Sequence, residues 1–389
     1  SKNLGSENYS KRLKEIQQVK KEKFEAVIDK MDNEPKFPFP SGPRKYQNEA
    51  FKAWLNNSYN GVFAMATGTG KTITSLNCLL NLYKDENRYQ CLILVPSISL
   101  LNQWEKEVSL FNFKKILKIG GSNSWEKELA NYVSNFTWDI KDNLVIISTY
   151  DSFISNRVQK YYTKIQKDFL LIADEAHNIG AKNRRKCFDK LIVDRKIGLS
   201  ATPKRAYDPE GTDALNNFFN DKPPFIYSFS MNQALLEGYL CNYKYYPKIV
   251  ELNEDEFEEY RKITRKLMLY FDAETSSFKK NQDVEKLLLR RKSIIHKASG
   301  KIEVLLNIID ELKKKNKLKY VFTYVPEGFD KDQESRIINN YMKAISQKHP
   351  ELKMNTYTNE ENVSELLRAF KEGKIDLLMA MKMLDEGVD

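Results

Sequence analysis

The stretch VFAMATGTGKT, from Val62 to Thr72, constrains the fold of this chain more than any other part of the sequence. An apolar, strand-like half breaks into a loop that carries Gly68 and Gly70, and Lys71 then opens a helix-like segment. A buried strand, a glycine-bearing loop and a helix start predict a phosphate cradle, in which the lysine neutralises the β- and γ-phosphates. The Thr72 hydroxyl would ligate Mg²⁺ there. The alternative is a glycine-rich turn that only caps a helix.

The segment FLLIADEAHNIG carries a second signal, two acidic residues directly after an apolar run. At the end of a buried strand, a carboxylate can meet a magnesium ion held by a phosphate loop. Asp174 would hold the metal, Glu175 would polarise the water that attacks the γ-phosphate, and His177 would couple the site to neighbouring elements. The alternative is an acidic helix N-terminus with a surface histidine.

Short apolar runs alternate with amphipathic segments between about residues 43 and 235, and they are apolar enough to be strands covered on both faces. These runs are GVFAM (61–65), CLILV (91–95), LVIIS (144–148), FLLIA (169–173) and KIGLS (196–200). The alternation predicts an α/β fold with a doubly wound parallel sheet. A charged, helix-periodic stretch follows, and then KYVFTY, KMNTY and DLLMA predict a second unit of the same kind.

Three motifs, in this order, resemble motifs I, II and III of the superfamily 2 helicases and translocases: ATGTGKT, DEAH, and SAT at Ser200 to Thr202. The phosphate loop of that family lacks the first glycine of GxxxxGK[ST], which agrees with Met65 at that position. Further matches are PRKYQ to the Q motif, LVPSISLLNQW to motif Ia, STYDSF to motif Ib and MAMKMLDEGVD to motif V. The resemblance spans about residues 43–389. It is closest to the DEAH-type, restriction-like branch, with type III and type I restriction subunits and phage-defence helicases.

The resemblance implies two RecA-like doubly wound lobes, the second apparently incomplete. Residues 1–42 are then an N-terminal helix and linker, 43–235 the ATP-binding lobe, 236–300 a helical connection and 301–389 the truncated second lobe. Nothing after MAMKMLDEGVD could be motif VI, whose arginines reach the γ-phosphate in this family. We therefore expect the sequence to be a fragment, or the observed portion, of a longer protein.

The resemblance also assigns roles to single residues. Arg44 and Gln47 would read adenine, since an amide can donate to and accept from its edge, although a charged helix start is the alternative. Ser97 and Thr149 would bind phosphates of a nucleic-acid strand, and either could equally be a helix N-cap. Nucleotide binding would also involve Thr67, Gly68, Thr69, Gly70, Lys71, Thr72, Glu386, Gly387 and Asp389. Ser200 and Thr202 would couple ATP hydrolysis to nucleic-acid binding. The alternative is that SATP is only a turn.

Composition adds weaker constraints. The net charge of +10 favours a polyanionic partner, although an even spread of lysine gives the same total. The run KKKNKLK, from Lys313 to Lys319, could contact such a backbone or be the solvated end of a helix. No uncharged run approaches the roughly 20 residues of a membrane-spanning helix, and no secretory signal begins the sequence, so we expect a cytoplasmic protein. The four cysteines lack CxxC spacing, which argues against a disulfide framework or zinc site and predicts buried thiols.

These features predict an ATP- and Mg²⁺-dependent superfamily 2 helicase or translocase that acts on nucleic acid, with DNA favoured over RNA, in a bacterial restriction or phage-defence system. Partner subunits are possible, and no membrane is involved. The alternative is a nucleotide-gated DNA-binding or assembly subunit without unwinding activity. DNA versus RNA, unwinding versus translocation, and polarity stay open, because such proteins hold mainly the nucleic-acid backbone.

Overall fold

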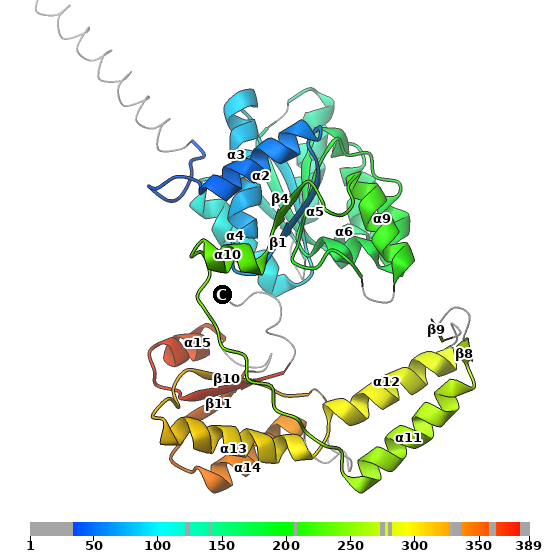
Figure 1. Cartoon of the computed structure of the whole chain (residues 1–389). Coiled ribbons are helices and arrows are strands. Elements are labelled where there is room, and N and C mark those ends of the chain that lie inside the picture. The colour runs from blue at the N-terminus through cyan, green and yellow to red at the C-terminus, as the bar shows by residue number, and fades with distance from the viewer. Residues whose placement is uncertain are drawn as a thin grey trace, which may run out of the picture. The chain divides into compact units, whose positions relative to one another are not determined.

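The computed structural model describes residues 34–120, 125–140, 142–205, 208–272, 277–278, 282–326, 328, 336–357 and 363–381. The chain divides into two compact units, one within residues 1–242 and the other within residues 243–388 (Figure 1). Most of the predicted N-terminal helix and most of the predicted motif V lie outside the described residues.

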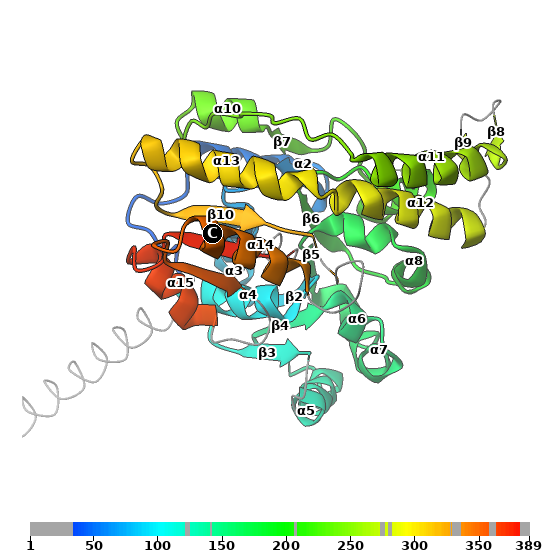
Figure 2. The same ribbon diagram turned by 90° about the horizontal axis from the view of Figure 1, so that it is seen from below.

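Within the described residues, the first unit is built on a seven-stranded parallel sheet with the strand order β3-β4-β2-β5-β6-β1-β7 (Figure 2). The strands are β1 (Asn60–Met65), β2 (Gln90–Val95), β3 (Ile116–Ile119), β4 (Leu144–Thr149), β5 (Leu170–Ala173), β6 (Arg195–Ser200) and β7 (Tyr227–Phe229). The predicted parallel α/β sheet is confirmed, and its five predicted runs are β1, β2, β4, β5 and β6. The sequence pattern missed the two edge strands, because β3 and β7 are short and only partly buried.

Helices cover both faces of this sheet, as side-chain alternation along the strands requires. In β2, Ile93 belongs to one apolar cluster and Leu92 and Leu94 belong to the other. The first face is covered by α2 (Lys45–Asn56), α3 (Lys71–Glu86), α4 (Ile98–Leu110) and α10 (Met231–Leu236). The second face is covered by α5 (Trp125–Thr137), α6 (Tyr150–Phe153), α7 (Asn156–Tyr162), the 3₁₀ helix η2 (Ala176–Gly180), α8 (Lys182–Phe188) and α9 (Pro209–Phe219). Another 3₁₀ turn, η1 (Gln166–Asp168), precedes β5.

The second unit repeats the arrangement on a smaller scale. Its described part holds a three-stranded parallel sheet in the order β10-β12-β11. The sheet strands are β10 (Val321–Tyr324), β11 (Met354–Tyr357) and β12 (Leu377–Ala380), which match the three predicted runs. The helices beside this sheet are α13 (Gly300–Lys314), α14 (Ile337–Lys348) and α15 (Val363–Lys371). Ile309, Ile338, Leu377 and Met379 are among the residues that form its apolar core.

A helical hairpin precedes this sheet in the second unit. Helix α11 (Glu254–Met268) packs along α12 (Gln282–His296), with a small apolar cluster of Ile263, Leu267 and Val284 between them (Figures 1 and 2). Near the turn, β8 (Phe271–Asp272) pairs antiparallel with β9 (Ser277–Phe278). The charged, helix-periodic stretch of the sequence therefore forms this hairpin.

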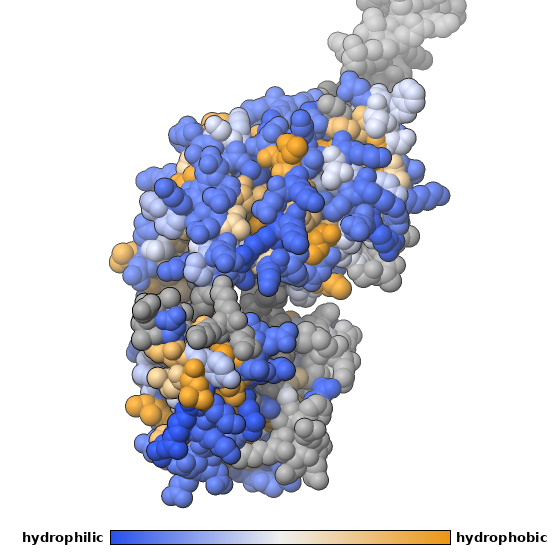
Figure 3. Space-filling model, turned by 90° about the vertical axis from the view of Figure 1, so that its right-hand side faces the viewer, coloured by the Kyte–Doolittle hydropathy of each residue, from blue (hydrophilic) through white to orange (hydrophobic). Residues whose placement is uncertain are grey.

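The surface of each unit is largely hydrophilic, with scattered apolar side chains on the face that Figure 3 shows. In the described part of the chain, no helix combines the length and the apolar character that crossing a bilayer requires. Cys78 and Cys91 are buried as predicted, and burial raises the pKa of both thiols. The prediction was wrong for Cys241, which is exposed because the segment after α10 lies at the surface.

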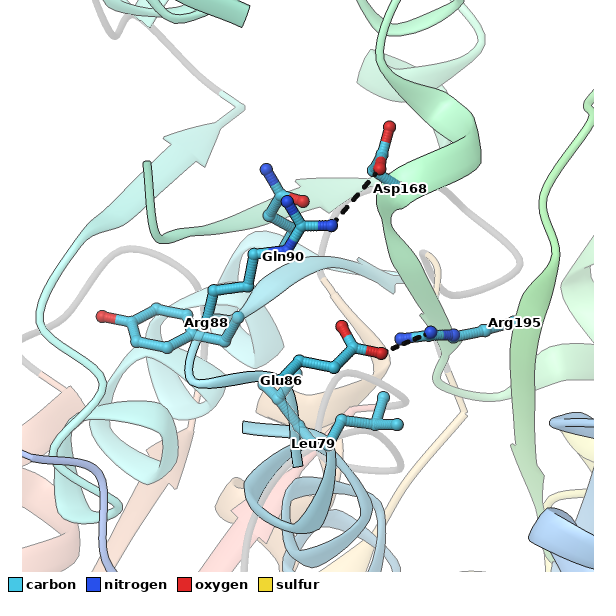
Figure 4. Close-up of a pocket in the computed structure, with 8 residues that line it drawn as sticks. Leu79, Glu86, Arg88, Gln90, Asp168 and Arg195 are labelled. Carbon is cyan, nitrogen blue, oxygen red and sulfur yellow. Dashed lines mark hydrogen bonds and ion pairs between the residues drawn. The ribbon is translucent and has the colours of Figure 1, made fainter. Parts of the chain in front are cut away.

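Ion pairs close the amino-terminal edge of the first sheet (Figure 4). Arg195 at the start of β6 pairs with Glu86 at 2.5 Å, and Arg88 before β2 pairs with Asp168 at 3.5 Å. The cavity that these residues line has a volume of about 10 Å³, which is room for about one water molecule. The ion pairs at this edge therefore join neighbouring strands and helices, and the cavity between them is too small for a ligand. The loops that carry the predicted site residues lie at the opposite edge, at the carboxyl ends of the strands.

Gly180 at the end of η2 lies against Gly211 in α9, and a Cβ added at Gly180 would overlap the carbonyl oxygen of Gly211. We predict that Gly180→Ala lowers the free energy of unfolding by about 2 kcal/mol, because backbone atoms on both sides must shift. Gly120→Ala is the control, since its nearest neighbour is the flexible end of Leu101 at 3.3 Å. Urea unfolding measures both variants, and equal stability of the two would contradict the tight packing of η2 on α9.

Candidate nucleotide site

The loop between β1 and α3 has the shape of an anion cradle. Gly68 and Gly70 have φ values of 78° and 76°, a left-handed conformation that glycine adopts without strain. The Thr69 hydroxyl donates to the Ala66 carbonyl oxygen at 2.6 Å, and the Tyr46 hydroxyl donates to the Thr69 carbonyl oxygen at 2.5 Å. Gly70 is the N-cap of α3 and brings no side-chain oxygen, so the first amides of the helix are left for an anion.

Arg44 and Gln47 lie beside this loop, at the start of α2. Gln47 is only 3% exposed, and its Oε1 accepts the Arg44 backbone amide at 2.9 Å. Its Nε2 lies 3.5 Å from the position that a Cβ on Gly70 would occupy. The Arg44 guanidinium lies 4.9 Å from the centroid of the Tyr239 ring. Gln47 therefore caps the start of α2, and its amide nitrogen also lies next to the phosphate loop. A contact of Gln47 or Arg44 with adenine stays a prediction.

Asp174 follows β5 directly and is only 8% exposed. The Trp104 indole donates to its Oδ2 at 2.8 Å, and the Glu175 amide donates to its Oδ1 at 3.0 Å. Burial raises the pKa of Asp174, and the Trp104 bond and the charge of Lys71 oppose that rise. The loop lysine and the buried carboxylate therefore interact electrostatically across the ends of β1 and β5.

Glu175 and His177 join this carboxylate to the end of β6. Glu175 has a φ of 45°, a left-handed conformation that is strained for a residue with a side chain and that occurs often at functional sites. The His177 Nδ1 lies 3.4 Å from Glu175 Oε2 and 3.5 Å from the Ser200 hydroxyl oxygen. Burial lowers the pKa of His177, and the positive charges of Arg205 and Arg184 lower it further. The imidazole therefore lies between Glu175 and Ser200, in surroundings that favour its neutral form.

The sequence did not predict a group of charged residues that bonds the backbone of this segment. Arg205, Asp208 and Arg185 form this group, called the arginine clamp below. The Arg205 Nη1 donates to the His177 carbonyl oxygen at 2.6 Å, and its Nε donates to Asp208 Oδ2 at 2.8 Å. The Arg185 Nη2 donates to Asp208 Oδ1 at 2.7 Å. Burial alone would raise the pKa of Asp208, but these bonds and the Gly211 amide lower it to about 2. The signal in the sequence was Arg205 three residues before Asp208 and two residues after the end of SATP.

Comparisons with known proteins agree with this geometry. Residues 41–205 match the family described as "Type III restriction enzyme, res subunit". The chain is 26% identical to the DNA 3'-5' translocase XPB2 of Sulfurisphaera tokodaii over 364 residues, which is 89% of this chain and 72% of that protein. The chain is therefore similar to superfamily 2 proteins, in their restriction-like branch. The enzymes of this superfamily are ATP hydrolases.

Two further relatives extend the comparison. A type I restriction enzyme subunit, the EcoAI endonuclease subunit of Escherichia coli, is 28% identical over 214 residues, which is 52% of this chain and 24% of that protein. The helicase domain of Pyrococcus furiosus Hef has a similar fold, with a TM-score of 0.52, 16% identity, and coverage of 92% of this chain and 89% of that one. The chain therefore spans most of the translocase and about a quarter of the type I subunit.

The residues predicted to bind nucleic acid also lie at the carboxyl ends of the strands. The Ser97 hydroxyl, after β2, accepts the Leu100 amide at 3.4 Å, and the Thr149 hydroxyl, at the end of β4, accepts the Ser152 amide at 3.2 Å. Both are therefore N-caps, and their contact with phosphates stays a prediction. Ser200 is buried and accepts the amide of the exposed Thr202 at 3.2 Å. The predicted motif V residues Glu386, Gly387 and Asp389 lie outside the described residues.

The oxygen donors at this edge suit a hard divalent cation. Thr72 lies in the first turn of α3, and each oxygen of Asp174 accepts one bond and has a lone pair left for a metal or a water. The described residues contain no group of three or more His, Cys, Asp or Glu side chains able to hold a metal. Mg²⁺ normally binds through one or two protein oxygens together with phosphates and waters, and these residues fit that mode.

Asp208 is the centre of the clamp, and its loss separates two arginines from their shared acceptor. We predict that Asp208→Asn lowers the free energy of unfolding of the first unit by about 2 kcal/mol at neutral pH, since two charge-assisted bonds disappear. Glu210→Gln is the control, because Glu210 is 72% exposed and its bond to Arg185 is worth little.

The pH dependence follows from the lowered pKa of about 2. A carboxylate with a depressed pKa stabilises the fold above its unfolded pKa of about 3.9 and loses that effect as pH falls through its folded pKa. The difference between the parent and Asp208→Asn should therefore be constant from neutral pH to about pH 5 and shrink toward about pH 2. Thermal unfolding at a series of pH values measures it, and a difference that changes near neutral pH would contradict the assignment.

Proposed function

We propose that the chain is the motor of an ATP-dependent DNA helicase or translocase that serves a bacterial restriction or phage-defence system. The observation that carries the proposal is the convergence of the phosphate loop after β1 and the acidic pair after β5, where the charge of Lys71 acts on the buried Asp174. In the proposal, residues 43–235 and 301–389 are the two lobes, and residues 236–300 connect them.

Each residue of the edge has one task in this mechanism. Lys71 neutralises charge on the β- and γ-phosphates, while the first amides of α3 hold a phosphate. Thr72 and Asp174 hold Mg²⁺, which when bound would neutralise the charge that develops during phosphoryl transfer. Glu175 orients and polarises the attacking water. Trp104 keeps the carboxylate of Asp174 fixed, because the indole N–H bonds one of its oxygens.

Coupling to nucleic acid would use the same edge. Ser97 and Thr149 stand at the carboxyl ends of β2 and β4, where cap hydroxyls can also meet phosphates. His177 lies between Glu175 and Ser200, so a change at the γ-phosphate can reach the segment that Arg205 holds. The name of the Sulfurisphaera tokodaii relative, a DNA 3'-5' translocase, supports DNA as the substrate. The matches to type III and type I restriction subunits support the defence setting.

ATPase rates of the complete protein with single-stranded DNA, duplex DNA and RNA, measured in parallel, test the proposal. We expect DNA to stimulate hydrolysis and RNA to stimulate it less. A strand-displacement assay on a fork beside a triplex-displacement assay then separates unwinding from translocation on duplex. An ATPase rate that no nucleic acid changes would favour the alternative, a nucleotide-gated binding or assembly subunit.

Lys71→Ala should abolish ATP hydrolysis, because the loop loses the charge that neutralises the phosphates. Glu175→Gln should also abolish turnover but trap bound ATP, since the amide keeps the shape of the side chain without polarising water. Nucleic-acid binding should survive both changes. Filter binding with labelled ATP, together with phosphate release, distinguishes the two, and hydrolysis by Glu175→Gln at the parent rate would refute the role of Glu175.

A further inference from the structure

The side chain of Arg184, in α8, connects the segment after β4 to the segment after β5. Its Nη2 and Nε donate to Asp151 Oδ1, in α6, at 2.8 and 3.2 Å. Its Nη1 donates to Asn178 Oδ1, in η2, at 2.8 Å. The Arg184 side chain is only 12% exposed, so water competes little for these bonds. One guanidinium therefore joins the segment that carries Thr149 to the segment that carries the acidic pair.

The bond to Asn178 leads to the backbone of Glu175. The Asn178 Nδ2 donates to the Glu175 carbonyl oxygen at 3.0 Å, and the Asn178 backbone amide donates to the same oxygen at 2.9 Å. The Asn178 side chain thus donates with its nitrogen while its oxygen accepts from Arg184, which fixes the orientation of the amide. Glu175 is the residue with the left-handed φ of 45°, and such a conformation needs support from its surroundings. Arg184 therefore supports the backbone of the residue proposed to polarise water.

A second connection runs through the ring of Tyr150. The carbon at the centre of the Arg184 guanidinium lies 5.0 Å from the centroid of this ring. The Tyr150 hydroxyl donates to the Asp174 carbonyl oxygen at 2.7 Å, and Tyr150 is buried and follows Thr149 directly. A guanidinium over an aromatic face is attracted to it, more strongly where water is excluded. The carbonyl oxygens of both acidic residues are therefore bonded by side chains that Arg184 contacts.

Arg157, in α7, makes the same two kinds of contact elsewhere on the first unit. Its Nη2 donates to Glu126 Oε2 at 2.8 Å, and its guanidinium carbon lies 5.3 Å from the centroid of the Trp125 ring. These contacts join α7 to α5. Within the described part of the chain, the Arg157 side chain has no bond to α6 or η2. An arginine with a carboxylate and an aromatic ring is therefore not special in this unit, and the position of Arg184 is.

We propose that Arg184 is a positioning residue that couples nucleic-acid binding at the end of β4 to the ATP site at the end of β5. The inference rests on the proposed function, which places a phosphate of the nucleic acid near Thr149 and the attacking water near Glu175. A strand bound near Thr149 changes the position of Asp151, and Arg184 carries that change to the backbone of the acidic pair. The same contacts carry a change at the ATP site back to the end of β4.

The test is a binding cycle on the complete protein with a fluorescent oligothymidylate and a non-hydrolysable ATP analogue in the presence of Mg²⁺. Coupling between two sites is reciprocal, so each ligand changes the Kd of the other by the same factor. Arg184→Gln should reduce this coupling factor by about fivefold. The Kd of each ligand measured alone should stay close to that of the parent, which a general loss of structure would not allow. The matched control, Arg157→Gln, should leave the coupling factor unchanged.

A second variant tests the bond itself. Asp151→Asn keeps the size of the side chain and removes the charge that accepts from Arg184. This change should lower the coupling factor in the parent but not in Arg184→Gln, because the effects of two residues that act through one contact are not additive. The Asp151 side chain is 71% exposed, so Asp151→Asn gives the same test if Arg184→Gln does not fold. Thermal unfolding shows which variants are folded.

The outcomes separate this proposal from the proposed function. A coupling factor that falls in Arg184→Gln and not in Arg157→Gln supports the proposal. A factor that both variants keep, or that both lose equally, overturns it and leaves the proposed function intact. Loss of oligothymidylate binding by Arg184→Gln without nucleotide would show a direct contact with the strand and overturn the positioning role. A parent without coupling overturns the proposal as well, and the ATPase rates with and without nucleic acid then decide the proposed function separately.

Discussion

The hydrogen bond from the Trp104 indole to Asp174 ties the chemistry of the first unit to its core. Trp104 is buried in α4, on one face of the sheet. Tyr150 lies in α6, on the other face, and its hydroxyl donates to the Asp174 carbonyl oxygen at 2.7 Å. A buried carboxylate needs such bonds, because burial without them favours its neutral form. The acidic end of β5 is therefore oriented by packing on both faces of the sheet.

The residues that follow Asp174 are held in place by their backbone geometry and by hydrogen bonds from charged side chains. Glu175 takes a left-handed conformation that turns the following residues into η2, and η2 is pressed against α9 by the contact of Gly180 with Gly211. Arg205 then bonds the His177 carbonyl oxygen, which ties the segment after β6 to the acidic segment. The strained backbone conformation of Glu175 is maintained because the surrounding contacts fix the residues on both sides of it.

Much of this could be predicted from the sequence. Continuous apolar runs such as CLILV mark strands covered on both faces, and the Gly-Lys-Thr and Asp-Glu segments each follow such a run. The edge strands β3 and β7 could not be predicted, because ILKI and YSF are short, only partly buried and each interrupted by a polar residue. The clamp at Asp208 also escaped, since an arginine and an aspartate three residues apart normally form a weak surface pair.

The sequence by itself determined the order of motifs, the parallel α/β class and the residues that could meet a nucleotide, because strand propensity and loop chemistry are local. Only the tertiary structure decided which strand ends lie together. In the strand order, β5 and β6 lie between β2 and β1. This order brings Lys71 and Asp174 within electrostatic reach although about a hundred residues separate them in the sequence. It also decided that Ser97 and Thr149 cap helices, and that Arg184 joins α6 to η2. Such meetings depend on long-range packing of apolar faces, which no local pattern encodes.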